Sequence, residues 1–228
     1  MKLATLRDRS RDGRLVVVSR DLTLCSDARH LAPTLQAALD AWDEVAPALE
    51  LIARGIEAGA QPVRRFHERE ALAPLPRAYQ RADAAGRHGT RSFAPPRAPA
   101  AAGPARIGLA ALTGDLPAGA GPDAAAAALR LVLLLHEGED GATLAPAAVT
   151  PDELGPGDLT LDPALGLGGQ SLGPAPDLAA AIARAARDRA LIAGCLVAGE
   201  PLSDAAAPAR IEIRDAAGRS IFGAIERS

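Results

Sequence analysis

The sequence predicts an α+β fold that is mainly β, and two observations support this class. Short apolar runs with the alternation of strands occur at both ends of the chain, while helical periodicity is clearest at 34–58 and 177–190. The 228 residues allow a small domain followed by a larger one. We expect a small N-terminal α/β domain over 1–70 and a larger β domain over 71–228.

The first elements are expected to be a β-hairpin. Strand-like runs at Lys2–Leu6 and Leu15–Ser19 flank a polar turn that contains Asp12 and Gly13. An Asp-Gly pair between such runs is a strong hairpin signal because its backbone accepts positive φ angles.

A helix should follow the hairpin. Leu35, Leu39 and Trp42 form an apolar stripe at helical spacing, and Thr34 is a candidate N-cap. Pro47 is expected to break or kink this helix, because proline lacks the backbone N–H. A second helical segment should then end near Gly59.

The rest of the chain alternates regular and irregular stretches. Residues 84–106 are rich in Ala, Pro, Gly and Arg, and predict a flexible linker or an extended surface loop. The elements expected after it are a strand at 106–112, a helix from Pro122, a buried strand at 131–135, a turn capped by Thr150, an irregular stretch at 155–176, a helix at 177–190 and two strands around Gly218.

Composition excludes several classes of function. A formal net charge of −3 argues against nucleic acid as a partner, and no apolar run is long enough for a membrane span. Cys25 and Cys195 form no metal-binding pattern and predict free thiols in the cytoplasm. Lys2 is the only lysine, and its place in the chain makes a buried catalytic role unexpected.

Five segments in order resemble bacterial members of the fumarylacetoacetate hydrolase family: "MKLATLRDRSRDGRLVVVSRDL", "EALAPLPRAYQRAD", "LTGDLP", "AAVTPDELG" and "RIEIRDAAGRSIFGAIE". The resemblance implies a shortened mixed β-sandwich roll, usually dimeric. It also implies metal-assisted hydrolysis of a C–C bond in a fumarylacetoacetate- or acylpyruvate-like dicarbonyl acid, as in aromatic catabolism. Carboxylates would hold Mg²⁺ or Ca²⁺, a hard cation that stabilises an enolate.

The same resemblance assigns candidate site residues. Asp83 matches the first metal-binding carboxylate and Glu137 stands at the position of the last one. The two carboxylates expected between them are replaced by Arg106 and Gly108. His88 is two positions short of the family's catalytic histidine, whose place is taken by Thr90. Of the substrate-binding loop, Gly199 and Ser203 remain, and the segment that carries the family's lysine is missing.

The sequence is compatible with two functions. The first is a divergent hydrolase whose activity is weak or lost, with either a divalent ion or no cofactor at all. Glu139 and Asp140 could replace missing ligands, or they belong to a solvated loop. The second is a non-catalytic binding or structural subunit, which would form a homodimer or bind another protein.

Overall fold

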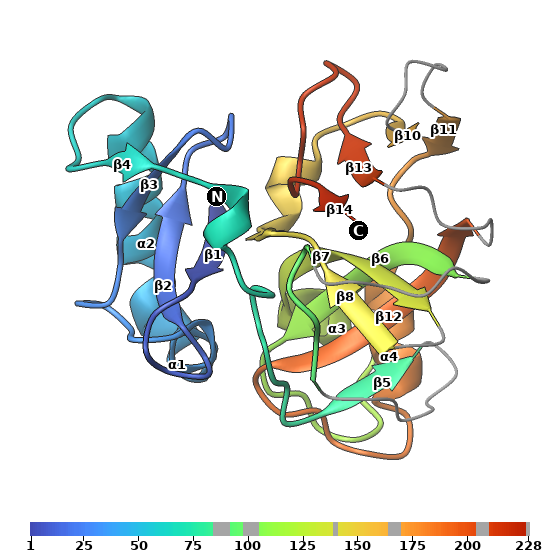
Figure 1. Cartoon of the computed structure of the whole chain (residues 1–228). Helices are drawn as coiled ribbons and strands as arrows, with labels where there is room; N and C mark the ends of the chain where they lie inside the picture. The colour runs from blue at the N-terminus through green and yellow to red at the C-terminus, as the bar shows by residue number, and fades with distance from the viewer. Residues whose placement is uncertain (84–91, 98–104, 139–140, 164–169, 204–209, 227–228) are drawn as a thin grey trace.

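In the computed structural model, the strands form two sheets, and the larger sheet runs through both halves of the chain (Figure 1). The structure describes residues 1–83, 92–97, 105–138, 141–163, 170–203 and 210–226. The predicted α+β class, mainly β, is confirmed. The order of the large sheet is β4-β3-β2-β1-β9-β7-β6-β12-β5, with β8 paired to β7.

The N-terminal part of the large sheet is covered on one face by two helices. Its first two strands are buried on both faces. They pair antiparallel, which confirms the predicted hairpin. The elements are β1 (Lys2–Leu6), β2 (Arg14–Val18), β3 (Leu24–Asp27), α1 (Leu35–Asp40), α2 (Trp42–Glu57), β4 (Arg64–Arg65) and the 3₁₀ turn η1 (Glu68–Glu70).

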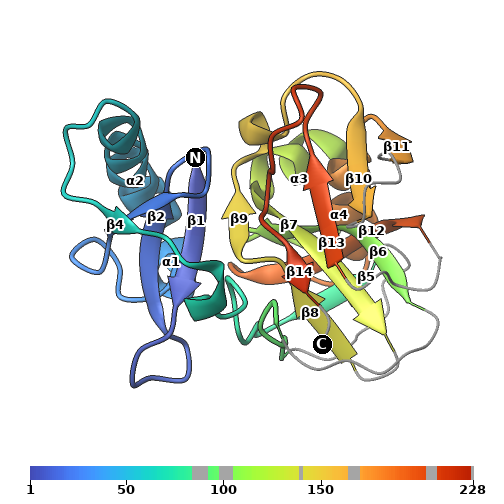
Figure 2. The ribbon, with the colours of Figure 1, turned by 45° about the horizontal axis from the view of Figure 1, so that its top comes forward.

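The C-terminal part contains the rest of the large sheet and the small sheet β11-β10-β13-β14, on opposite sides of one core (Figure 2). Its elements are β5 (Arg81–Asp83), β6 (Arg106–Thr113), α3 (Pro122–Ala128), β7 (Leu129–Gly138), β8 (Gly141–Leu144), β9 (Ala147–Val149), the 3₁₀ turn η2 (Pro151–Leu154), β10 (Leu159–Pro163), β11 (Gln170–Gly173), α4 (Leu178–Ala185), β12 (Cys195–Ser203), β13 (Arg210–Arg214) and β14 (Ile225–Glu226).

The two parts are joined by strand pairing. β1 lies antiparallel to β9, with Leu3 opposite Ala148 and Ala4 opposite Ala147. The first strand of the chain therefore lies in the middle of the sheet instead of at its edge. The division between residues 70 and 71 stays a prediction, since one sheet continues through both sides of it.

Several local predictions need correction. The first helix breaks at Ala41, and α2 continues through Pro47. Pro47 lies in the second turn of α2, so the bond that its missing N–H would have made is close to the helix end. Thr34 caps α1 as predicted, by accepting a hydrogen bond from the Ala37 N–H, whereas the Thr150 side chain makes no cap bond to η2.

The stretches predicted to be irregular contain regular pairing. Strands β10 and β11 lie within 155–176, although its glycines and prolines predicted no strand. Within the predicted loop at 84–106, Phe93 is buried and Ala94 pairs with Thr143, while 84–91 and 98–104 lie outside the described residues. The predicted pair of strands around Gly218 is confirmed: β13 pairs antiparallel with β14, and a bridge from Arg214 to Ser220 lies next to the turn.

Three apolar clusters form the core. The first lies between the large sheet, α3, α4 and the small sheet; the second lies on the opposite face of the large sheet, under α1 and α2; the third lies beside β1 and β2. Cys195 belongs to the first and Cys25 to the third, and both thiols are free as predicted. Among the described helices, none has the length and apolar character that crossing a bilayer requires.

Candidate functional site

The candidate site lies where one face of the large sheet changes from apolar to charged. Side chains on a strand alternate between faces, so Arg106 and Gly108 share the face of Ala110 in the second core cluster. On β7, Glu137 continues the buried row of Leu133 and Leu135. Pairing of β6 with β7 sets Arg106 directly opposite Glu137.

Arg81 reaches this charged end from β5, at the edge of the sheet. Its side chain is 7% exposed and its Nη2 donates to Oε1 of Glu137 in a close ion pair, where the Glu137 side chain is 31% exposed. The Arg81 guanidinium also lies over the ring of Phe93, 5.8 Å from the centroid, in a cation–π contact. Arg81 is therefore held both by an acid and by an aromatic ring.

Burial affects the pKa of Arg81 more strongly than the neighbouring charge does. Burial lowers the pKa of Arg81 from its ordinary value, and the nearby Asp83 carboxylate opposes this effect. A guanidinium stays protonated throughout the range in which proteins are folded. The Glu137 carboxylate is thus neutralised by a permanent cation.

The predicted metal ligands Asp83 and Glu137 both lie near Arg81, where a divalent cation was expected. Asp83 is on the same strand and face as Arg81, and Glu137 pairs with that arginine. Within the described parts of the chain, no three His, Cys, Asp or Glu side chains gather around a common point. Glu139 and Asp140 lie outside those parts. The described donor set does not fit a carboxylate site for Mg²⁺ or Ca²⁺, because two arginines enter it.

The other predicted site residues remain predictions. His88 lies outside the described residues. Ser203 pairs through its backbone with Ile107 at the end of β12. Gly199 has a packing role: a Cβ there would lie 2.9 Å from the Leu109 carbonyl oxygen and 3.0 Å from Leu178 Cδ2. That direction points toward α4 and away from Glu137.

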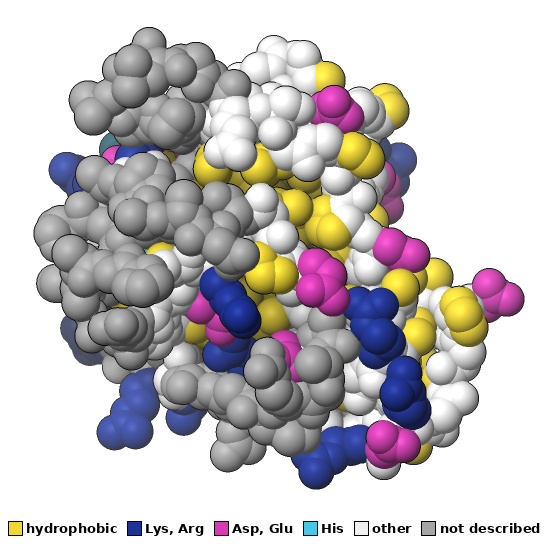
Figure 3. Space-filling view, turned by 90° about the vertical axis from the view of Figure 1, so that its right-hand side faces the viewer, with side chains coloured by type: hydrophobic (Ala, Val, Ile, Leu, Met, Phe, Trp, Pro, Cys, Tyr) yellow, Lys and Arg dark blue, Asp and Glu magenta, His cyan; other side chains and the backbone are white. Residues whose placement is uncertain are grey.

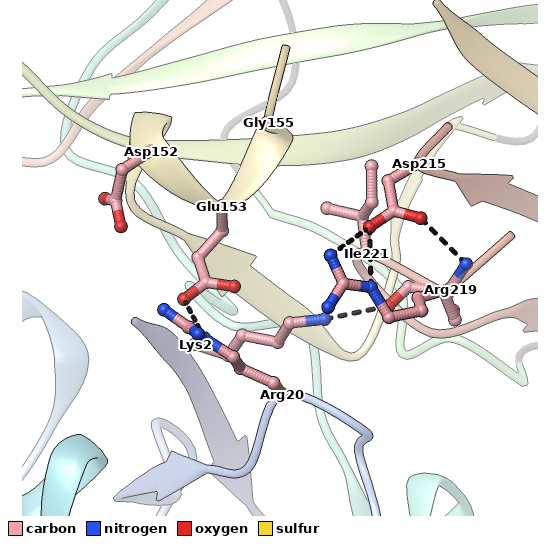
Figure 4. Close-up of a pocket in the computed structure, with 9 residues that line it drawn as sticks. Lys2, Arg20, Asp152, Glu153, Gly155, Asp215, Arg219 and Ile221 are labelled. Carbon is pink, nitrogen blue, oxygen red and sulfur yellow. Dashed lines mark hydrogen bonds and ion pairs between the residues drawn. The ribbon is translucent and has the colours of Figure 1, made fainter. Parts of the chain in front are cut away.

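A second charged site contains Lys2, the only lysine of the sequence. Lys2 is 3% exposed, and its Nζ donates a 2.8 Å hydrogen bond to the carbonyl oxygen of Ser220 (Figure 4). Burial lowers its pKa to about 8, against the opposing influence of Glu153 and Asp215. The expectation that this lysine would not be buried is wrong, because β1 is inserted between β2 and β9.

On the face seen in Figure 3, cationic and acidic side chains lie beside one another around apolar ones. Such mixing agrees with the near-balanced net charge of the sequence.

Residues 1–77 match the family model described as fumarylacetoacetase N-terminal domain 2. The whole chain has the fold of fumarylacetoacetate hydrolase-type proteins. A comparison with curated protein sequences gave no match.

Three solved structures illustrate the likeness in fold, and each is compared over all of this chain. Maleylpyruvate hydrolase from Sphingobium sp. SYK-6, in complex with manganese(II) ion and pyruvate, is 16% identical over 98% of its own chain, with a TM-score of 0.70. A putative HpcE protein from Mycobacterium smegmatis is 15% identical over 99% of its chain, with a TM-score of 0.63. Fumarylacetoacetate hydrolase from Exiguobacterium antarcticum is 14% identical over 100% of its chain, with a TM-score of 0.56.

Proposed function

We propose that the protein is a divergent fumarylacetoacetate hydrolase-type protein in which metal-assisted C–C bond hydrolysis is weak or lost. The ion pair between Arg81 and Glu137 carries this proposal. A divalent cation would have to displace a buried guanidinium from Glu137 and would then lie close to it, and both steps oppose binding. Arg106 adds a second positive charge opposite Glu137.

The ancestral reaction identifies the compounds to test. Fumarylacetoacetate- and acylpyruvate-like acids are the substrate class implied by the family, and the similar maleylpyruvate hydrolase was solved with pyruvate and manganese. Without an ion to stabilise the enolate, the remaining site would bind such an acid through arginine side chains and turn it over slowly if at all.

Thermal unfolding with and without millimolar Mg²⁺ or Mn²⁺ tests this proposal directly. We expect a melting temperature that changes by less than about 1 °C, because an ion that does not bind the native state cannot stabilise it. Acylpyruvate turnover, followed by loss of enol absorbance, should equal the rate with Glu137→Gln. A rise of several degrees that disappears in both Asp83→Asn and Glu137→Gln would show a working metal site and contradict the proposal.

A second candidate function is a non-catalytic subunit that pairs with a second copy of the chain. The observation that favours it is a pair of exposed apolar side chains, Tyr79 at 64% and Ile192 at 44% exposure. Gln80 connects their segments, because its side chain accepts from the Ile192 N–H and donates to the Ala190 carbonyl oxygen. Exposed apolar groups that lie together are typical of interaction surfaces.

Sedimentation or size-exclusion measurements test this candidate. We expect Tyr79→Asp to shift the protein from dimer to monomer. Leu51→Asp is the matched control, since Leu51 is equally exposed at 61% but lies on α2. A dimer that survives Tyr79→Asp, or dissociates equally with Leu51→Asp, would count against pairing through this surface.

A further inference from the structure

A small cavity lies between β1 and the turn that follows β13, on the side of the sheet opposite the Arg81–Glu137 pair. Its volume is about 150 Å³. One water molecule needs only about 15 Å³ of such space, so the cavity has room for a small organic molecule. The lining residues that matter here are Lys2, Arg20, Glu153, Asp215, Arg219 and Ser220.

The cavity has a buried amine at its base and a charged, exposed rim. Lys2 is 3% exposed. The side chains of Arg20, Asp152 and Arg219 are 65%, 70% and 68% exposed. Figure 4 shows Lys2 extending past Glu153 and Arg20 toward Arg219. A solute can therefore meet the arginines first and the amine last.

The local contacts favour a reactive amine. The hydrogen bond from Nζ goes to the uncharged Ser220 carbonyl, and burial outweighs the nearby carboxylates Glu153 and Asp215, so the pKa of Lys2 falls to about 8. At pH 7.5 about a quarter of such amines lack the extra proton, against about one in a thousand for an ordinary lysine. Only the unprotonated amine is a nucleophile.

The rim supplies cations that suit a carboxylate. Arg20 contacts Glu153 through Nε at 3.3 Å, and Arg219 pairs with Asp215 at 2.8 Å. Each guanidinium has five N–H donors in a planar fork, so both retain donors beyond these contacts. A compound with a carbonyl group next to a carboxylate carries both groups that this cavity can engage, since Lys2, Arg20 and Arg219 all line it.

We propose that Lys2 is a site of reversible imine formation with a small 2-oxo acid, whose carboxylate is bound by Arg20 or Arg219. The amine nitrogen attacks the carbonyl carbon, the carbonyl electron pair moves to oxygen, and a proton transfers from nitrogen to that oxygen. Loss of the second N–H proton with the hydroxyl group releases one water molecule and leaves the C=N bond. No oxidant or metal is needed.

This site is independent of the proposed function. Its residues come from β1, the turn after β2, η2 and the turn after β13, and none of them belongs to the group around Glu137. Imine formation at Lys2 would stand whether or not hydrolysis is lost.

Reductive trapping of the full-length protein tests the proposal. The native chain is incubated with pyruvate or glyoxylate and cyanoborohydride, and the label is located by intact mass and fragment mass spectrometry. Because Lys2 is the only lysine, the label can lie only there or on the α-amino group. We expect Lys2 to carry at least ten times more label than the α-amino group. The extent of Lys2 labelling should increase with pH, with a midpoint near pH 8.

Matched variants and reagents separate the parts of the proposal. Lys2→Arg should abolish side-chain labelling, and Arg20→Gln with Arg219→Gln should reduce it severalfold. Acetone, which lacks the carboxylate, should label Lys2 at least tenfold less than pyruvate. Label confined to the α-amino group would contradict imine formation at Lys2. Equal labelling by acetone and pyruvate would contradict recognition of the carboxylate by the arginines. Labelling that increases when urea unfolds the wild-type chain would show that the folded cavity does not favour the reaction, and this test needs no variant to fold.

Discussion

Arg81 and Lys2 are both buried cations, but their surroundings differ. Arg81 is 7% exposed and pairs with an acid, while Lys2 is 3% exposed and donates to a neutral carbonyl oxygen. The arginine keeps its charge because its pKa is far above neutrality even after burial. The lysine can lose its proton, and burial brings its pKa to about 8. The same cost of burying charge thus produces a fixed ion pair at one site and a titratable amine at the other.

The largest expected effect comes from removing the acid beside Arg81. Glu137→Gln leaves a buried guanidinium without its main partner and should lower the free energy of unfolding by about 3 kcal/mol. Urea unfolding measures the loss. The control is Asp12→Asn, which breaks the more exposed pair with Arg77 and should cost less than about 1 kcal/mol. Equal losses would show that Arg81 is not held by Glu137.

Lys2 should give the protein a stability that increases with pH. Its folded pKa of about 8 is below the ordinary 10.5, so between these values the unfolded chain binds more protons than the folded one. The free energy of unfolding should therefore rise by about 2 kcal/mol from pH 8 to pH 10. Lys2→Met should remove this rise.

The comparison with Lys2→Met is needed because the cysteines act in the opposite sense. Burial raises the pKa of Cys195 to about 12, so the unfolded chain loses this proton first and stability falls above pH 9. The quantity to measure is the difference between wild type and variant in urea unfolding at each pH. A difference that does not change from pH 8 to pH 10 would show that Lys2 titrates normally.

The smallest effect concerns the ring beside Arg81. Phe93→Leu keeps an apolar side chain but removes the cation–π contact, and should cost about 1 kcal/mol. In an Arg81→Met background the same change should cost about half as much, because the cation is absent. Calorimetric or urea unfolding of the double-mutant cycle measures the coupling. No coupling would mean that Phe93 acts through packing alone.

Local signals in the sequence were enough for much of the fold. The hairpin around Gly13, the Thr34 cap and the buried strand at 131–135 all depend on residues close together in the chain. Strand β10 was missed because its main partner, β13, lies about fifty residues later, and its own glycines and prolines predict irregular structure.

The candidate site was predicted only in part, for a similar reason. The family resemblance placed Arg106 and Gly108 at the positions where two carboxylate ligands were expected, and the register of β6 and β7 sets Arg106 opposite Glu137. Nothing local indicated that Arg81 would pair with Glu137, 56 residues away. The burial of Lys2 could not be inferred either, because it depends on β9 pairing with β1 from the far side.

That pairing of β1 with β9 has a consequence for dissecting the molecule. A fragment ending at residue 77 would expose the backbone N–H and C=O groups of β1 along an open edge. The remaining fragment would expose the unpaired edge of β9 at Val149. When mixed, the two fragments should associate by pairing β1 with β9, whereas either fragment alone should aggregate through its open edge.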